Sequence, residues 1–233
     1  MNRIIVPLDV ASADEALDLV DRLGDDSDFY KVGFELFTRA GPAIVRTLVD
    51  RRKRVFLDLK LHDIPNTVAR AVQAASDLGV DLLTVHAAGG PTMLTAAAEA
   101  RSGSLRLLGV TVLTSLSPDE MGTVWDREIR SVRDDVGRLA VMARDAGIDG
   151  VVASALEASW IRGEVGQDVL IVTPGIRPAG ADVGDQSRIA TPADAVRSGA
   201  DYLVIGRPIT RADDPAAAFR TITNEIDGAI AAP

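Results

Sequence analysis

Eight short runs of apolar residues recur along the chain, and longer segments with helical periodicity separate them. The runs are rich in Val, Ile and Leu and lack a clean alternation with polar residues. This pattern is typical of strands that are buried on both faces of a parallel sheet. We therefore expect parallel strands at residues 3–8, 29–33, 54–59, 82–86, 105–113, 150–153, 169–173 and 202–205.

The segments between these runs carry helix start and stop signals. Ser12 and Glu15 have the spacing of a capping box, and Gly79, Gly147 and Gly199 stand where helices are expected to end. We expect one helix to begin at residue 12, and others at 42–52, 66–78, 91–101, 131–146, 155–162, 192–198 and 215–230.

Eight strand–helix units in 233 residues predict an α/β fold with a single domain, a (β/α)₈ TIM barrel over residues 1–233. A doubly wound open sheet is the main alternative. Such a sheet usually carries G-x-G-x-x-G after its first strand, whereas the first strand of this chain ends in PLDVAS.

The composition removes several classes of function. The chain has no Cys and only two His, which excludes disulfides, zinc–thiolate sites and a His-rich metal site, so we expect no metal. A net charge of −9 argues against nonspecific binding to nucleic acid. No apolar run reaches the ~18 residues of a membrane span, and the N-terminus does not resemble a signal peptide. We therefore expect a cytoplasmic protein with no membrane partner.

The basic residues are strongly biased toward Arg, because the chain has three Lys and 22 Arg. Lys31 and Lys60 lie in apolar strand-like runs next to carboxylates, whereas Lys53 is expected to be a solvated helix end. Arg stays protonated in proteins, but Lys can release its proton and its pKa moves readily on burial. The bias therefore predicts that Lys31 and Lys60 are retained for chemistry.

Ionisable residues cluster where the expected strands end, which is where TIM barrels place their functional residues. Asp9 follows the first strand, Lys31 lies in the second, and the third carries Asp58, Lys60 and Asp63 in the pattern D-x-K-x-x-D. Residues two apart in an extended chain point the same way, so Asp58 and Lys60 are expected to pair. The alternative is a structural ion pair at the barrel rim, with Asp63 as a helix cap.

A second group of residues predicts an anion site. Phosphate sites in these barrels form from the loops after strands seven and eight, and those loops carry Arg177, Gln186, Gly206 and Arg207. The loop at 174–191 is long for a compact domain, which favours a functional role. Arg207 in a surface ion pair is the alternative.

Two further residues stand near the expected strand ends. His86 is expected to be a hydrogen-bonded structural residue at the end of the fourth strand. Thr114 is expected at the end of the fifth, where its hydroxyl could bind a polar ring.

The segments DLKLHDIPNT at 58–67, IVPLD at 5–9, YKVG at 30–33, TPGIR at 173–177 and IGRPI at 205–209 resemble the orotidine 5′-phosphate decarboxylase family, in order and over essentially the whole chain. The D-x-K-x-x-D pattern alone is shared with sugar-phosphate decarboxylases and synthases of the same suprafamily. The loop after the seventh strand discriminates between them.

The resemblance implies a fold and a reaction. The reaction is decarboxylation of orotidine 5′-monophosphate to UMP, the last step of de novo pyrimidine synthesis, with no metal or organic cofactor. Lys60 would stabilise the negative charge at ring carbon C6 and deliver the replacing proton, with Asp58 near the departing carboxylate. Lys31 would hold Asp58 and bind the ribose, whose hydroxyls Asp9 would also bind.

The resemblance also implies a homodimer, in which Asp63 and Thr67 complete the site of the neighbouring subunit. The substrate contacts that it implies are Ile64, Thr114 and Pro174, with Arg177, Gln186, Gly206 and Arg207 at the phosphate, over which the mobile loop 174–191 would close. Two alternatives remain open. One is a magnesium-dependent 3-keto-gulonate-phosphate decarboxylase or hexulose-phosphate synthase, and the other is a non-catalytic sensor of phosphorylated ligands.

Overall fold

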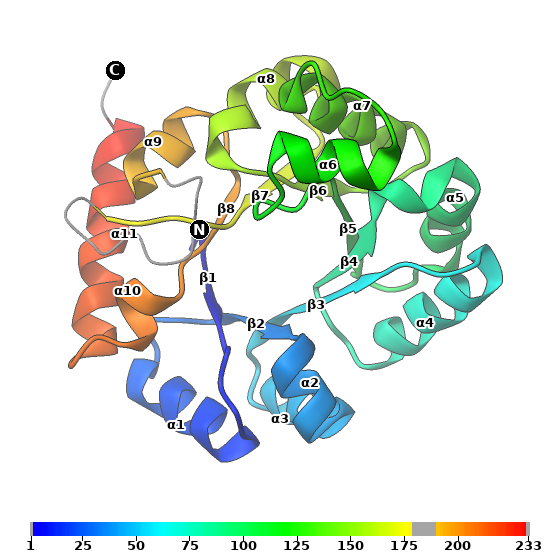
Figure 1. Ribbon diagram of the computed structural model, residues 1–233. Helices are drawn as coiled ribbons and strands as arrows, with labels where there is room; N and C mark the ends of the chain where they lie inside the picture. The colour runs from blue at the N-terminus through cyan, green and yellow to red at the C-terminus, as the bar shows by residue number, and fades with distance from the viewer. Residues whose placement is uncertain (1, 179–189, 232–233) are drawn as a thin grey trace.

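Eight parallel strands close into a barrel in the order β1 to β8, as Figure 1 shows. The structure is a computed structural model that describes residues 2–178 and 190–231. The strands are β1 (Ile4–Pro7), β2 (Phe29–Gly33), β3 (Arg54–Leu61), β4 (Leu82–His86), β5 (Arg106–Val110), β6 (Gly150–Val152), β7 (Leu170–Thr173) and β8 (Tyr202–Val204). The predicted (β/α)₈ barrel is confirmed, and each expected strand is present.

Helices surround the barrel and connect its strands (Figure 1). They are α1 (Ala13–Leu23), α2 (Phe34–Ala40), α3 (Pro42–Asp50), α4 (Pro65–Asp77), the 3₁₀ turn η1 (Ala87–Gly89), α5 (Gly90–Ala100), α6 (Pro118–Trp125), α7 (Val132–Asp145), α8 (Ala155–Val165), α9 (Pro192–Arg197), α10 (Arg207–Thr210) and α11 (Pro215–Ala231). The expected helices are all found, whereas α2, η1, α6 and α10 were not expected.

The inside of the barrel changes from apolar to polar along the strands. Near the amino ends, inward side chains from seven strands form one apolar cluster of Ile5, Phe29, Phe56, Leu82, Leu108, Val172, Tyr202 and Val204. Because side chains of a strand alternate between its two faces, the next inward positions are two residues further along. On β2, β3 and β4 these positions hold Lys31, Asp58 and Thr84. The barrel interior is therefore filled by apolar side chains near the amino ends of the strands and carries polar and charged side chains near their carboxyl ends.

The outward side chains of the strands pack against the helices in a second, larger core. Tyr30 and Leu83 are fully buried there, next to the inward-facing Lys31 and Leu82. Burial on both faces explains why the strands read as continuous apolar runs without polar alternation.

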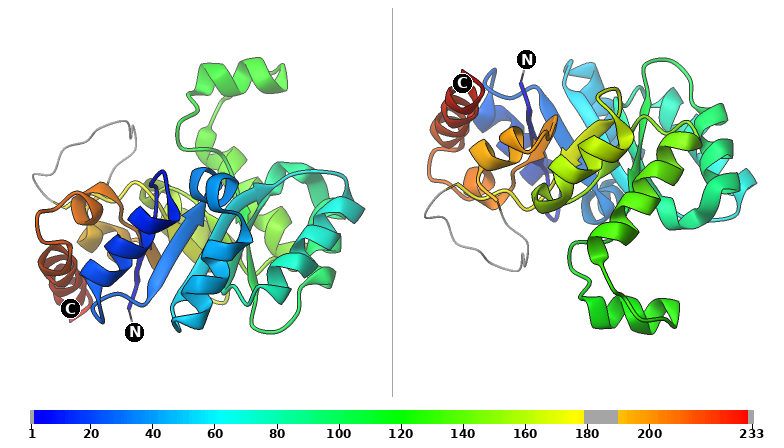
Figure 2. Two further views of the ribbon diagram at one scale, coloured as in Figure 1. Left: turned by 90° about the horizontal axis from the view of Figure 1, so that it is seen from below. Right: turned by 90° about the horizontal axis from the view of Figure 1, so that it is seen from above.

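Helix α6 stands away from the carboxyl end of the barrel, as both views of Figure 2 show. It starts with a full capping box between Ser117 and Glu120 and ends at Asp126, whose backbone is left-handed with a φ of 48°. Val124 on this helix is 68% exposed. In the part of the chain that the structure describes, no helix combines the length and the apolar character needed to cross a membrane.

Candidate active site

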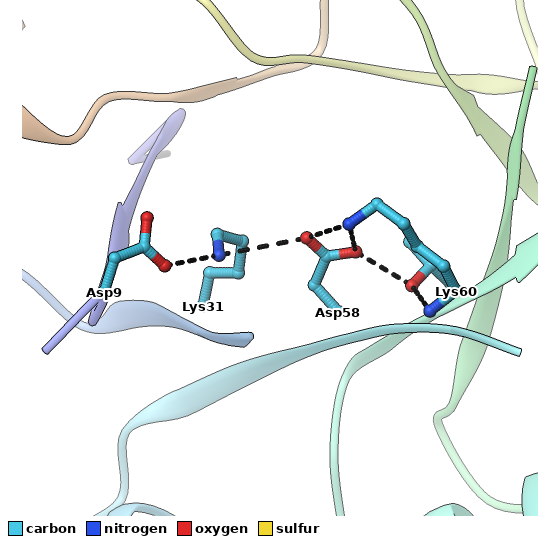
Figure 3. Close-up of polar contacts among 5 residues, drawn as sticks. Asp9, Lys31, Asp58 and Lys60 are labelled. Atoms are coloured by element: carbon cyan, nitrogen blue, oxygen red, sulfur yellow. Dashed lines mark hydrogen bonds and ion pairs between the residues drawn. The ribbon is translucent and has the colours of Figure 1, made fainter. Parts of the chain in front are cut away.

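Four charged side chains form a continuous array at the carboxyl ends of β1, β2 and β3, which Figure 3 shows. The Nζ of Lys31 lies 2.9 Å from Asp9 Oδ1 and 3.8 Å from Asp58 Oδ2. The Nζ of Lys60 lies 2.9 Å from each carboxylate oxygen of Asp58. The array therefore alternates in sign as Asp9, Lys31, Asp58 and Lys60. These four residues were expected to cluster at the strand ends, and they lie together there.

The centre of the array is shielded from water and its ends are open. The side chains of Lys31 and Asp58 are 12% and 14% exposed, whereas those of Lys60 and Asp9 are 31% and 64% exposed. A shielded charge requires a partner, since an unpaired ion in the interior costs several kcal/mol. Lys60 and Asp9, at the two ends of the array, are thus the members most accessible to a ligand.

The backbone of β3 is irregular where it carries these charges. Leu57 pairs with Leu83 of β4, but the next partners are Leu61 and Val85, so three residues of β3 stand opposite one residue of β4. Lys60 in this bulge has a φ of 47°, in the left-handed region that side chains other than glycine rarely adopt. The expectation that Asp58 and Lys60 lie on one face of a regular extended strand is therefore wrong, although the two side chains do pair.

The residue of β4 opposite this bulge is Thr84, which is fully buried. Its Oγ1 accepts a hydrogen bond from the backbone N–H of Lys60 at 2.8 Å and donates one to Asp58 Oδ1 at 2.9 Å. This contact was not predicted from the sequence. A signal was available, because Thr84 is a polar residue inside the apolar run LLTVH, on the same face of the strand as His86.

A cavity of about 350 Å³ continues from the array toward the last two strands. Its lining includes both Asp9 and Lys31, so it is continuous with the charged array. The residues on its far side come from the segment after β7 and from β8 and the turn that follows it; they include Pro174, Gly175, Arg177, Gly206 and Arg207. One cavity therefore contains residues of both expected groups, Asp9 and Lys31 of the charged array and Arg177, Gly206 and Arg207 of the anion site.

Arg177 lies deep in this wall and is 7% exposed. Its Nη1 donates to the carbonyl of Ile176 at 2.8 Å, and its backbone N–H donates to Ala190 at 2.9 Å. Gly206 is packed closely, since a Cβ atom there would lie 3.1 Å from Cγ of Pro7. Gln186, also expected at the anion site, lies outside the described residues.

The start of α4 projects from the site toward solvent. Asp63, Ile64 and Thr67 are all exposed, with Ile64 at 66%. The Oδ1 of Asp63 accepts a hydrogen bond from the N–H of Ile64 at 2.6 Å. Within residues 2–178 and 190–231, Asp63 forms no ion pair, so Asp63 does not pair with Lys60 of its own chain. Nor is Asp63 the helix cap, because the N-cap position of α4 is Ile64.

His86 lies next to the array at the end of β4. Its ring stacks on that of His62, with centroids 5.2 Å apart. Burial, and to a lesser degree the positive charges of His62 and Lys60, lower the pKa of His86. Its buried Nδ1 has no hydrogen-bond partner among the described residues, so the expected hydrogen bond at that atom is not found.

Thr114 does not end a strand, because β5 stops at Val110 and Thr114 follows it in the segment that leads to α6. Its side chain is partly buried. Among the residues described, no three His, Asp or Glu side chains converge in a way that could hold a metal ion.

Comparison with known proteins identifies relatives across nearly the full length. Residues 2–222 match the model of the orotidine 5′-phosphate decarboxylase / HUMPS family. Orotidine 5′-phosphate decarboxylase of Moorella thermoacetica is 53% identical over 97% of this chain and 92% of its own length. The corresponding protein of Methylobacterium sp. is 52% identical over 97% of this chain and 95% of its own length.

The fold gives the same result. The crystal structure of orotidine 5′-phosphate decarboxylase from Lactobacillus acidophilus superposes with a TM-score of 0.87 at 38% identity, over 97% of this chain and all of the other. An uncharacterized conserved protein from Geobacillus kaustophilus superposes with a TM-score of 0.83 at 37% identity, over 96% of this chain and 99% of the other. On sequence and structure alike, the chain belongs to the orotidine 5′-phosphate decarboxylase / HUMPS family.

Proposed function

We propose that this protein decarboxylates orotidine 5′-monophosphate to UMP and CO₂ in the cytoplasm, as the final step of de novo pyrimidine synthesis, without metal or organic cofactor. The observation that carries the proposal is the cavity that joins Lys31 and Asp9 of the charged array to Arg177 and Arg207. A nucleotide with a phosphate at one end and a carboxylated ring at the other needs both parts in one site.

In the proposed reaction, the bond between ring carbon C6 and the carboxylate breaks and its electron pair stays on C6. The Nζ of Lys60 then gives a proton to C6 and recovers one from water. An ammonium about 3 Å from a full negative charge contributes about 5 kcal/mol at an effective dielectric constant of about 20. An interaction of that size, made only in the transition state, corresponds to a rate factor of roughly 10³–10⁴.

Asp58 and Lys31 would keep the ammonium in place during this charge movement. Lys60 Nζ contacts both oxygens of Asp58, and Lys31 balances that carboxylate from the other side. Groups that are fixed before the reaction do not have to reorganise during it, which is how preorganised sites lower a barrier. Asp58 would lie near the departing carboxylate, and Lys31 and Asp9 would bind the ribose hydroxyls.

The phosphate would bind to Arg177, Gln186, Gly206 and Arg207, and the loop over residues 174–191 would close on it. An Arg guanidinium matches a phosphate with two parallel hydrogen bonds. Binding energy from this unreactive end of the substrate can then stabilise the transition state at the ring. Pro174 and Thr114 would contact the rest of the nucleotide.

We infer further that the enzyme works as a homodimer in which Asp63, Ile64 and Thr67 complete the neighbour's site. The exposure of Asp63 and Ile64 beside the array supports this role. A carboxylate supplied by a partner would extend the alternation of charge beyond Lys60, which has no second acid partner among the described residues of its own chain.

The decisive assay follows the ultraviolet absorbance of orotidine 5′-monophosphate and the release of UMP, with and without EDTA. We expect turnover that EDTA leaves unchanged. Loss of activity in EDTA, or turnover of 3-keto-gulonate phosphate in its place, would assign the chain to the magnesium-dependent branch. Tight binding of UMP with no turnover would make it a sensor.

Mixed dimers test the shared site. Asp63→Asn and Lys60→Ala each inactivate both sites of their own homodimer, but a heterodimer of the two contains one unchanged site. With random pairing, we expect recovery of about a quarter of the wild-type activity. No recovery, with heterodimers demonstrated by native mass spectrometry, would show that Asp63 acts within its own chain, and an active Asp63→Asn homodimer would show that it has no part.

A further inference from the structure

We propose that Thr84 is a positioning residue of this site: its buried hydroxyl holds both the carboxylate of Asp58 and the backbone of Lys60 in the geometry that the reaction needs. The inference rests on the proposed function for its catalytic consequence. Its structural part, a clamp between β3 and β4, rests only on the contacts of this chain.

The clamp follows from the bulge in β3. Asp58, Leu59 and Lys60 stand opposite Thr84 alone, because the pairing register shifts between Leu57 and Leu61. A bulge disrupts the regular ladder of backbone hydrogen bonds between two strands. The N–H of Lys60 is directed instead to Oγ1 of Thr84 at 2.8 Å, so a side chain of β4 takes the place of a ladder acceptor.

The direction of the two hydrogen bonds is fixed by the chemistry of the partners. A backbone N–H can only donate and an ionised carboxylate can only accept, so the hydroxyl must accept from Lys60 and donate to Asp58. Thr84 is fully buried and β-branched, which leaves its side chain little rotational freedom. One hydroxyl therefore fixes the carboxylate and the backbone at the same time.

The position of the Lys60 ammonium depends both on the carboxylate of Asp58 and on the backbone of Lys60. Lys60 Nζ is held by the two oxygens of Asp58, while its Cα is held in the left-handed conformation by the bulge. Without the hydroxyl, the N–H of Lys60 loses its acceptor and Asp58 loses one of the donors that orient it. A displacement of about 1 Å at a reacting group can lower a rate by roughly 100-fold.

The test compares Thr84→Val, which keeps the shape and removes the hydroxyl, with Thr84→Ser, which keeps the hydroxyl. Thr111→Val is the matched control, because Thr111 is equally buried but its hydroxyl donates to a backbone carbonyl, that of Val152, at 3.1 Å. We expect Thr84→Val to lower kcat by roughly 100-fold with KM within threefold of wild type. Thr84→Ser should restore kcat to within about fivefold, and Thr111→Val should keep the wild-type kcat even if it melts earlier.

Three outcomes would overturn the proposal. The first is a kcat of Thr84→Val within threefold of wild type, the second is an equal loss in Thr84→Ser, and the third is an equal loss in Thr111→Val. If Thr84→Val does not fold, Thr84→Cys replaces it, since a thiol is a weaker hydrogen-bonding group in nearly the same space. The same loss of kcat is expected, and a wild-type kcat would reject the clamp.

Exchange of the Lys60 amide hydrogen tests the clamp independently of the proposed reaction. The amide of Lys60 should be protected in the wild type, should exchange at least 10-fold faster in Thr84→Val, and should be unchanged in Thr111→Val. This measurement needs no substrate. If the wild type shows no decarboxylation but the exchange result holds, the proposed function fails and the clamp stands; unchanged exchange in Thr84→Val removes the clamp.

Discussion

Replacing Lys60 with glycine should give a more stable protein than replacing it with alanine. Both substitutions remove the ammonium and its contacts with Asp58, so the two variants differ in backbone preference alone. The φ of 47° at Lys60 lies in the left-handed region, where any residue with a Cβ is strained and glycine is not. The difference in stability between Lys60→Gly and Lys60→Ala therefore reports on the backbone conformation of residue 60 in the bulge.

The magnitude follows from two opposing terms. A left-handed backbone costs roughly 1–2 kcal/mol for a residue with a Cβ, and glycine escapes that cost. Glycine in a folded chain also costs roughly 0.5–1 kcal/mol more conformational entropy than alanine. The free energy of unfolding of Lys60→Gly should therefore exceed that of Lys60→Ala by about 0.5–1 kcal/mol. At an ordinary strand position, alanine is the more stable of the two residues.

Lys31 supplies the matched control, because it lies in the regular strand β2 and its ammonium belongs to the same array. Urea unfolding of the four variants, at one protein concentration, should show Lys31→Ala more stable than Lys31→Gly and Lys60→Gly more stable than Lys60→Ala. The reasoning is refuted if alanine is the more stable replacement at both positions by a similar amount.

Three further predictions concern the surroundings of the array. A Cβ on Gly33 would lie 2.8 Å from Lys31 Nζ and 3.5 Å from Asp9 Oδ1, so Gly33→Ala should lower kcat by roughly 10-fold or more; steady-state kinetics with unchanged kcat would show that the pair tolerates the methyl group. The pKa of His86 is lowered in the folded protein, so the unfolded chain binds its proton at higher pH, and stability should fall as the pH drops from about 7 through the folded pKa. His86→Asn should flatten this loss in melting temperatures measured from pH 8 to pH 5, and an equal slope in both proteins would contradict the assignment. Arg207→Ala should raise KM for the phosphorylated substrate by roughly 10–100-fold with a smaller change in kcat, and an unchanged KM would place the phosphate elsewhere.

The fold was predictable because its strands are buried on both faces and its helices carry clear caps. The missed helices had weaker signals. Helix α2 begins directly after Gly33, the last residue of β2, and no side chain caps its first turn, so nothing in the sequence separates it from the strand. Helix α6 has a capping box at Ser117 but lies in a strand–helix unit that already contains α7.

The charged residues of the site were predictable from their types and positions, but their geometry was not. The pairing of Asp58 with Lys60 was expected from a regular strand, whereas it arises from a bulge that local sequence does not encode. Thr84 was missed because a lone Thr in an apolar strand has no distinctive chemistry until its neighbours are known. Lys53 was expected to be solvated, yet its Nζ donates to the carbonyls of Gly24 and Ser27, at 2.8 Å and 2.9 Å.

The most direct test of the central claim is the turnover of orotidine 5′-monophosphate by Lys60→Ala, measured beside the affinity of the same variant for UMP. If the Lys60 ammonium stabilises the anion and delivers the proton, turnover should fall by at least 10³-fold while UMP still binds within about 10-fold of wild type. Lys53→Met should keep the wild-type turnover. A Lys60→Ala variant with near-normal turnover would contradict the account, because Lys60 could then not be the proton donor.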